Sequence, residues 1–335
     1  MQYITLGKTG LKISRLGFGG IPIQKIDADG TRKLFLMMKD AGINFVDTAR
    51  GYTVSESYIG EAIEGIREHF VLATKSMSRD KDGMAKDIET SLANLRTDYI
   101  DLYQIHNPNV AQLEQVIGEG GAIEALLEAK KAGKIGHIGV TAHSLEVFEK
   151  ALTLDFVETV MFPYNIVETH GEDLMRKCTE KNIGFIAMKP LAGGALDDAT
   201  LAMRFIVSNP DVTVVIPGMA DLKEIEQNVA AVSDTSPLTK DEENKIIEIR
   251  DTLGTQFCRR CNYCAPCTVG INISAVFLFD GYLTRYGLSD WATERYNAMG
   301  KKASDCIGCG VCEERCPYNL PIREMLKSAA ERFDK

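Results

Sequence analysis

The feature that most constrains this chain is an alternation of short apolar segments with amphipathic segments, repeated eight times between residues 15 and 232. The apolar segments predict strands near 15–19, 43–47, 70–75, 100–106, 137–140, 159–162, 185–188 and 212–216. The amphipathic segments predict helices near 31–40, 55–65, 84–95, 122–132, 145–151, 171–181, 198–208 and 221–232. Eight repeats favour a closed parallel barrel over an open sheet, so the expected fold class is α/β with a (β/α)8 TIM barrel.

The chain is longer than such a barrel requires. A (β/α)8 barrel takes roughly 250 residues, and this chain has 335. Beyond the alternation, residues 238–253 predict a charged helix, with Thr239 and Glu242 placed as a capping box. We therefore expect a barrel domain over residues 1–236 and a small, mainly helical domain over residues 237–335.

Polar side chains follow three consecutive strands at the points where those strands end. Asp47 and then Tyr52 follow the second strand, Lys75 ends the third and His106 ends the fourth. The C-terminal strand ends of a parallel barrel meet on one rim, so these four residues should converge. A nearby ammonium lowers the pKa of a phenol from about 10. Tyr52 could then exchange a proton with a carbonyl or alcohol oxygen that His106 also contacts, while a cofactor supplies hydride or electrons.

Five motifs within residues 2–231 carry a family resemblance. They are Leu16-Gly-Phe-Gly-Gly20, Asn44-Phe-Val-Asp-Thr-Ala-Arg-Gly-Tyr52, Leu72-Ala-Thr-Lys75, Asp98-Tyr-Ile-Asp-Leu-Tyr-Gln-Ile-His106 and Gly133-Lys-Ile-Gly-His-Ile-Gly-Val140. With these motifs the chain resembles the aldo-keto reductase family. The resemblance implies a (β/α)8 barrel that reduces carbonyls with NAD(P)H, and a catalytic tetrad of Asp47, Tyr52, Lys75 and His106.

The resemblance also implies contacts to a nicotinamide cofactor, at positions where this chain departs from the family. The implied positions are Gly20, Thr141, Asn165, Met188, Lys189, Pro190, Leu191, Gly193, Gly194, Pro217, Gly218, Met219, Gln227 and Asn228. Thr141, Ala142 and Met161 stand where the family has Ser, Asn and Gln, and Met188 stands where it has a stacking Tyr. Glu224 stands where an Arg would hold the adenosine 2′-phosphate, and a carboxylate suits a free ribose hydroxyl better. NADP, NAD and a flavin all stay open as the redox cofactor.

Eight cysteines fall into two runs in the C-terminal domain. The run Cys306-Ile-Gly-Cys309-Gly-Val-Cys312-Glu-Glu-Arg-Cys316-Pro317 is the C-x2-C-x2-C-x3-C-P pattern of bacterial ferredoxins. The run Cys258-Arg-Arg-Cys261-Asn-Tyr-Cys264-Ala-Pro-Cys267-Thr268 is similar, with a shorter last gap and Thr in place of Pro. Zinc sites usually use two separated pairs around one ion, so these spacings favour iron–sulfur, and eight ligands suit two 4Fe–4S clusters.

The pairing of the cysteines is expected by analogy with two-cluster ferredoxins, in which the fourth cysteine of a run reaches the other cluster. One cluster would use Cys258, Cys261, Cys264 and Cys316, and the other Cys267, Cys306, Cys309 and Cys312. A first run that holds its own cluster stays open as an alternative. The ninth cysteine, Cys178, stands alone on a predicted helix and is expected to be a small buried hydrophobic residue.

The composition of the chain limits its expected partners and its expected location in the cell. The net charge of −9 argues against nucleic acid as a partner. The N-terminus lacks a signal-peptide core, and no apolar run is long enough to cross a membrane, so we expect a cytoplasmic protein. Residues 271–300 carry aromatic residues at helical spacing, which predicts either core packing against the barrel or a docking face for an electron carrier.

Together these observations predict an oxidoreductase that interconverts a small carbonyl and an alcohol with a nicotinamide cofactor. Its iron–sulfur clusters would transfer electrons to or from a carrier protein. Two alternatives stay open: a nicotinamide-dependent reductase whose clusters are only structural, and a non-catalytic module that senses redox state or binds a ligand.

Overall fold

The computed structural model describes residues 1–254 and 256–334. The chain forms two compact units. The first contains residues 1–190 and 198–238, and the second contains residues 191–197 together with the described chain from Thr239 onward. Among the described residues, no helix has both the length and the apolar character that crossing a membrane requires.

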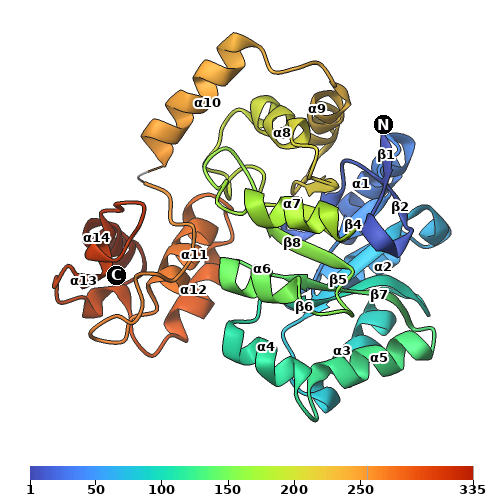
Figure 1. Cartoon of the computed structure of the whole chain (residues 1–335), viewed down its shortest axis with the longest axis horizontal. Helices are drawn as coiled ribbons and strands as arrows, with labels where there is room; N and C mark the ends of the chain where they lie inside the picture. Colours follow the sequence, from blue (N-terminus) through green and yellow to red (C-terminus); the bar gives the residue numbers. More distant parts are fainter. Residues whose placement is uncertain (255, 335) are drawn as a thin grey trace. The chain divides into compact units, whose positions relative to one another are not determined.

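The first unit is built on a sheet of eight strands (Figure 1). In sheet order these are β3 (Phe18–Gly19), β4 (Phe45–Asp47), β5 (Val71–Ser76), β6 (Ile100–His106), β7 (Ile135–Thr141), β8 (Thr159–Pro163), β9 (Gly184–Met188) and β10 (Val214–Ile216). All neighbours are parallel. A parallel bridge from Leu16 to Val215 joins the two edges, so the sheet closes into the predicted barrel.

Helices follow the strands in the predicted alternation. They are α1 (Ala28–Asp40), α2 (Ser55–Ala62), α3 (Lys81–Asn94), α4 (Val110–Ile117), α5 (Ala122–Lys131), α6 (Leu145–Ala151), α7 (Glu172–Glu180), α8 (Ala199–Ser208) and α9 (Leu222–Ser233). Helix α4 is absent from the sequence-based prediction, although Asn109 and Gln112 form a capping box at its start. The helix predicted over 55–65 ends earlier, at Ala62.

Apolar side chains fill the interior of the barrel. Strands β1 (Tyr3–Thr5) and β2 (Lys12–Ser14) form an antiparallel hairpin. The hairpin places Leu6 and Ile13 in one buried cluster with Phe45, Leu102 and other strand residues. Apolar packing fills the end of the barrel that the hairpin covers. The polar residues at the C-terminal ends of β4, β5 and β6 lie at the opposite end.

The second unit has its own small core. Its helices are α10 (Lys240–Leu253), α11 (Ile273–Thr284), α12 (Ser289–Asn297), α13 (Val311–Glu314) and α14 (Ile322–Phe333). Helix α10 begins with the predicted Thr239–Glu242 capping box. Phe277 and Tyr296 are buried in this unit, and Tyr296 stacks on Phe333 with ring centroids 4.2 Å apart. Both residues therefore belong to the core of the second unit, with α14 and the cysteine runs. Packing of the 271–300 aromatic residues against the barrel, or docking of a carrier on them, stays a prediction.

Candidate active site and cluster ligands

The structure brings the four residues of the predicted tetrad together. Asp47 ends β4, Lys75 lies in β5, His106 ends β6, and Tyr52 lies on the loop after β4. Lys75 Nζ is 2.5 Å from an Asp47 carboxylate oxygen and 4.9 Å from the centroid of the Tyr52 ring. The Tyr52 and His106 rings meet edge to face, with centroids 6.1 Å apart. A phenol, an ammonium, a carboxylate and an imidazole thus share one end of the barrel.

Lys75 and Asp47 are buried and held by further hydrogen bonds. Lys75 Nζ also donates to the Thr48 carbonyl at 2.7 Å, and Gln104 Nε2 donates to the second Asp47 oxygen at 2.9 Å. Burial lowers the pKa of Lys75, and the Asp47 carboxylate opposes that shift. The sequence-based prediction did not include Gln104 among the site residues. Its position as a polar residue inside the apolar strand 100–106 was a signal that could have indicated it. The pair is therefore fixed in position before any ligand binds.

His106 lies in a strongly cationic environment. Burial lowers the pKa of His106 well below its usual 6.5, and the charges of Lys75, Arg79 and Lys189 lower it further. The imidazole is therefore neutral at neutral pH. Its Nδ1 is buried and has no hydrogen-bond partner among the described residues. A neutral imidazole in this position can donate a hydrogen bond to a ligand oxygen.

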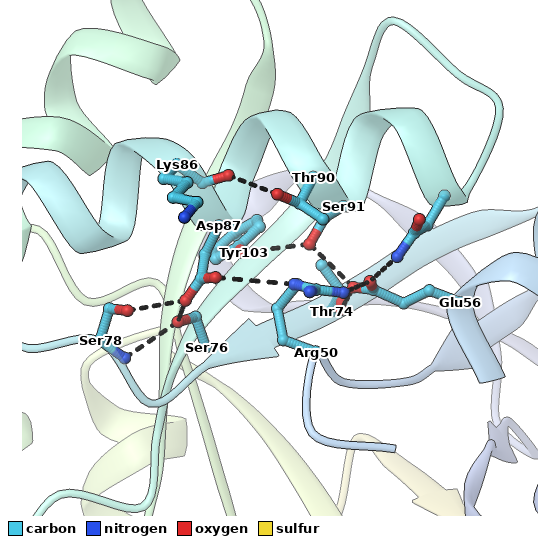
Figure 2. A network of polar contacts seen from close by, with 11 residues as sticks. Arg50, Glu56, Thr74, Ser76, Ser78, Lys86, Asp87, Thr90, Ser91 and Tyr103 are labelled. Atoms are coloured by element: carbon cyan, nitrogen blue, oxygen red, sulfur yellow. Dashed lines mark hydrogen bonds and ion pairs between the residues drawn. The ribbon is translucent and has the colours of Figure 1, made fainter. Parts of the chain in front are cut away.

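A buried polar network holds the loop that carries Tyr52 (Figure 2). Arg50, two residues before Tyr52, donates its backbone N–H to the Lys75 carbonyl at 3.0 Å and its Nη1 to Glu56 at 2.6 Å. Glu56 on α2 also accepts hydrogen bonds from Thr74 and Ser91, each at 2.8 Å. Because Thr74 precedes Lys75 in β5, the network ties the strand of Lys75 to the loop of Tyr52. The sequence motif contains Arg50 and lies close to Glu56, but local spacing did not indicate their pairing.

The positions implied for the nicotinamide cofactor divide between the two units. The first unit carries Gly20, Thr141, Asn165, Met188, Lys189, Pro190, Pro217, Gly218, Met219, Gln227 and Asn228, and the second carries Leu191, Gly193 and Gly194. Within the second unit, Arg285 Nε donates to the Gly193 carbonyl at 2.9 Å. Asn228 on α9 is buried, and its Oδ1 has no partner among the described residues, which suits an amino donor such as that of adenine.

Two of these positions already have structural partners. Asn165 donates to Glu168 at 2.7 Å and to the Lys189 carbonyl at 2.9 Å, so its side chain holds the loop after β8. Lys189 Nζ donates to His143 Nε2 at 2.7 Å, and Nδ1 of that histidine lies 2.8 Å from Asn107 Oδ1. The cofactor roles of Asn165 and Lys189 stay predictions.

The cysteines of the second unit line two separate cavities. One cavity is lined by Cys258, Cys261, Cys264 and Cys316, and the other by Cys267, Cys306, Cys309 and Cys312. This grouping is the crossed one expected from the analogy with two-cluster ferredoxins. The Thr268 hydroxyl lies 3.2 Å from Cys309 Sγ, so the end of the first run reaches a cysteine of the second run.

The donor set of each cavity fits an iron–sulfur cluster. Four cysteine thiolates are the usual ligand set of a 4Fe–4S cluster, and each cavity is lined by four cysteines. Among residues 1–254 and 256–334, no three cysteine, histidine or acidic side chains are close enough to hold a single metal ion. Cys178 is buried in the barrel unit and lines neither cavity, and burial raises the pKa of its thiol to about 12, as expected for a small hydrophobic residue.

Comparisons with known proteins cover both units. Residues 15–200 match the model of the aldo/keto reductase family, and residues 257–321 match that of a 4Fe-4S dicluster domain. L-galactose dehydrogenase of Arabidopsis thaliana is 29% identical over 295 residues, covering 71% of this chain and 90% of that protein. The aldo-keto reductase YhdN of Bacillus subtilis is 32% identical over 193 residues, covering 52% of this chain and 56% of that protein. The holo structure of an aldo-keto reductase from Bacillus halodurans matches with a TM-score of 0.65 at 26% identity, covering 74% of this chain and 96% of that one.

Proposed function

The chain belongs to the aldo/keto reductase family, and from that premise we propose that it interconverts a small carbonyl compound and the corresponding alcohol with a nicotinamide cofactor. The observation that carries the proposal is the convergence of Lys75, Asp47 and His106 on Tyr52. The similarity to named oxidoreductases supports the same class of reaction.

In the direction of reduction, the Tyr52 hydroxyl donates a proton to the carbonyl oxygen. The Lys75 ammonium stabilises the phenolate that remains, and Asp47 holds the ammonium in place. His106, uncharged at neutral pH, donates a hydrogen bond to the same carbonyl oxygen and orients it. When bound, the nicotinamide supplies the hydride. In the direction of oxidation, Tyr52 accepts the alcohol proton.

The nicotinamide cofactor would be held by the rim residues of the barrel unit, with Asn228 as a contact for adenine. Glu224 stands at the position where the family resemblance implies an arginine, and its carboxylate accepts a hydrogen bond from the Ala220 N–H at 2.6 Å. A carboxylate repels a 2′-phosphate, so we propose that NADH is used at least as well as NADPH. Steady-state rates with the two dinucleotides measure this preference.

We propose two 4Fe–4S clusters, one in each cysteine-lined cavity. Such clusters supply one-electron transfer, and an external carrier protein would be the electron partner. The alternative is that the clusters only hold the second unit together. Turnover measured anaerobically with the clusters oxidised and then reduced separates the two, because purely structural clusters would leave the rate unchanged.

The main test is Tyr52→Phe in anaerobically purified protein whose iron and sulfide contents have been measured. Loss of the proton donor should lower kcat by about 10²- to 10⁴-fold, while the iron content and the circular dichroism spectrum stay as in the wild type. Tyr58→Phe on α2 is the matched control and should leave kcat unchanged. Equal activity of Tyr52→Phe and wild type would instead favour a binding or redox-sensing module.

A further inference from the structure

Arg79 is a charged residue at the active-site rim that the proposed mechanism does not use. It lies in the loop after β5, and its Nη2 donates to the backbone carbonyl of His106 at 2.7 Å. The other two guanidinium nitrogens, Nε and Nη1, are buried and have no hydrogen-bond partner among the described residues. A buried donor without an acceptor is unfavourable, so this site favours a ligand that brings an acceptor.

The charges around His106 point to the same kind of ligand. Lys75, Arg79 and Lys189 all act on the imidazole as cations. Both oxygens of the tetrad carboxylate, Asp47, are already engaged, one by Lys75 and the other by Gln104. Burial lowers the pKa of Arg79 to about 10. This value is still well above 7, so the guanidinium remains charged at neutral pH. The rim therefore offers a cation with free donors beside the residue that orients the carbonyl.

We propose that Arg79 binds an anionic group, a carboxylate or a phosphate, carried by the carbonyl substrate. The inference rests on the proposed function, because it takes the carbonyl to bind at Tyr52 and His106. A planar guanidinium presents paired N–H donors that match the oxygens of a carboxylate or phosphate. Arg79 is partly exposed as a residue, while its Nε and Nη1 are buried, so an anionic group bound to these two donors would be shielded from water. Arg79 is hydrogen-bonded to the main chain of His106, whose side chain would contact the substrate carbonyl. The anionic group and the carbonyl must therefore be close together in the substrate, which implies a short molecule.

The test uses pairs of aldehydes that differ in charge: succinic semialdehyde with butanal, and glyceraldehyde 3-phosphate with glyceraldehyde. For each pair, the ratio of kcat/KM for the charged member to that for the neutral member is measured in wild type and in Arg79→Met. The ratio should fall by about 10- to 100-fold in the variant, the effect of losing a charged hydrogen bond. Arg79→Lys should keep part of the preference. Any damage to His106 lowers both rates and cancels in the ratio.

Three outcomes would overturn the proposal. The first is an unchanged ratio in Arg79→Met, which would mean that water satisfies the guanidinium. The second is an unchanged ratio with a raised KM for the dinucleotide, which would assign Arg79 to the cofactor phosphates. The third outcome comes from a measurement that needs no turnover, the melting temperature with added succinate or inorganic phosphate at equal ionic strength. The proposal expects these anions to raise the melting temperature of wild type more than that of Arg79→Met. Equal shifts would count against an anion site even in a protein that reduces no aldehyde.

Discussion

Replacing Arg50 with methionine tests whether the network in Figure 2 holds the active-site loop. Glu56 is only 1% exposed, and its side-chain partner of opposite charge is Arg50, which is 25% exposed. Its other contacts are neutral donors, from Thr74, Ser91 and Asn94. Methionine keeps most of the length of the arginine side chain but removes the charge and the hydrogen bond.

The size of the effect follows from the burial of Glu56. Removing one partner of a buried ion pair costs about 3–5 kcal/mol, because the other charge stays buried and uncompensated. Three neutral donors still contact the Glu56 carboxylate, so we expect the lower end, a loss of about 3 kcal/mol in the free energy of unfolding. The double variant Arg50→Met/Glu56→Gln should recover part of the loss, since it leaves no buried charge unpaired.

Arg96→Met is the matched control. Arg96 pairs with Glu61 and Glu64, and all three side chains are at least half exposed. Exposed pairs contribute about 0–1 kcal/mol. Urea unfolding followed by circular dichroism compares the variants, and kcat should fall in Arg50→Met because the Tyr52 loop loses its anchor. A loss in Arg50→Met no larger than that in Arg96→Met would refute the network as a support of the site.

Three further predictions concern protonation and the clusters. The pKa of His106 lies well below 6.5 in the folded chain, whereas the unfolded chain takes up this proton near pH 6.5. Stability should therefore fall as the pH drops below about 6.5, by up to about 1.4 kcal/mol per pH unit, and His106→Asn should show a shallower fall in urea titrations. The hydrogen bond between Thr268 and Cys309 should stabilise the reduced, more negative form of the cluster, and Thr268→Val removes it. One midpoint potential should therefore fall by roughly 20–60 mV while the other stays unchanged, as measured by redox titration followed by electron paramagnetic resonance. The double variant Cys258→Ser/Cys316→Ser should lose one cluster and keep roughly four irons per chain, because both cysteines line the same cavity. If each run of cysteines held its own cluster, both clusters would be lost. Cys178→Ser is the control and should keep the wild-type iron content.

Local patterns in the sequence were enough to predict the barrel and the polar residues that meet on one of its rims. Each strand and helix is encoded by the periodicity of a few neighbouring residues. Asp47, Lys75 and His106 each lie at or next to the C-terminal end of a strand, so a parallel barrel must bring them to one rim. The cysteine spacings were equally local, since C-x2-C-x2-C places thiols around a compact cluster. Helix α4 shows the limit of this approach. Its Leu113 and Val116 are buried at helical spacing, but the segment has only eight residues and follows a Pro-containing loop, so the pattern was too short to be predicted as a helix.

The tertiary structure alone decided which distant residues became partners. Ser91 contacts Glu56, Gln104 contacts Asp47, and Arg79 contacts the main chain of His106, in pairs that are 27 or more residues apart in the sequence. The same holds for the cysteines, since the analogy suggested a crossed pairing and the cavities show Cys316 beside the first run and Cys267 beside the second. The physical reason is that a hydrogen bond, an ion pair or a ligand set depends on distance in space. Sequence spacing predicts such distances within one helix, strand or loop, but packing sets them between elements.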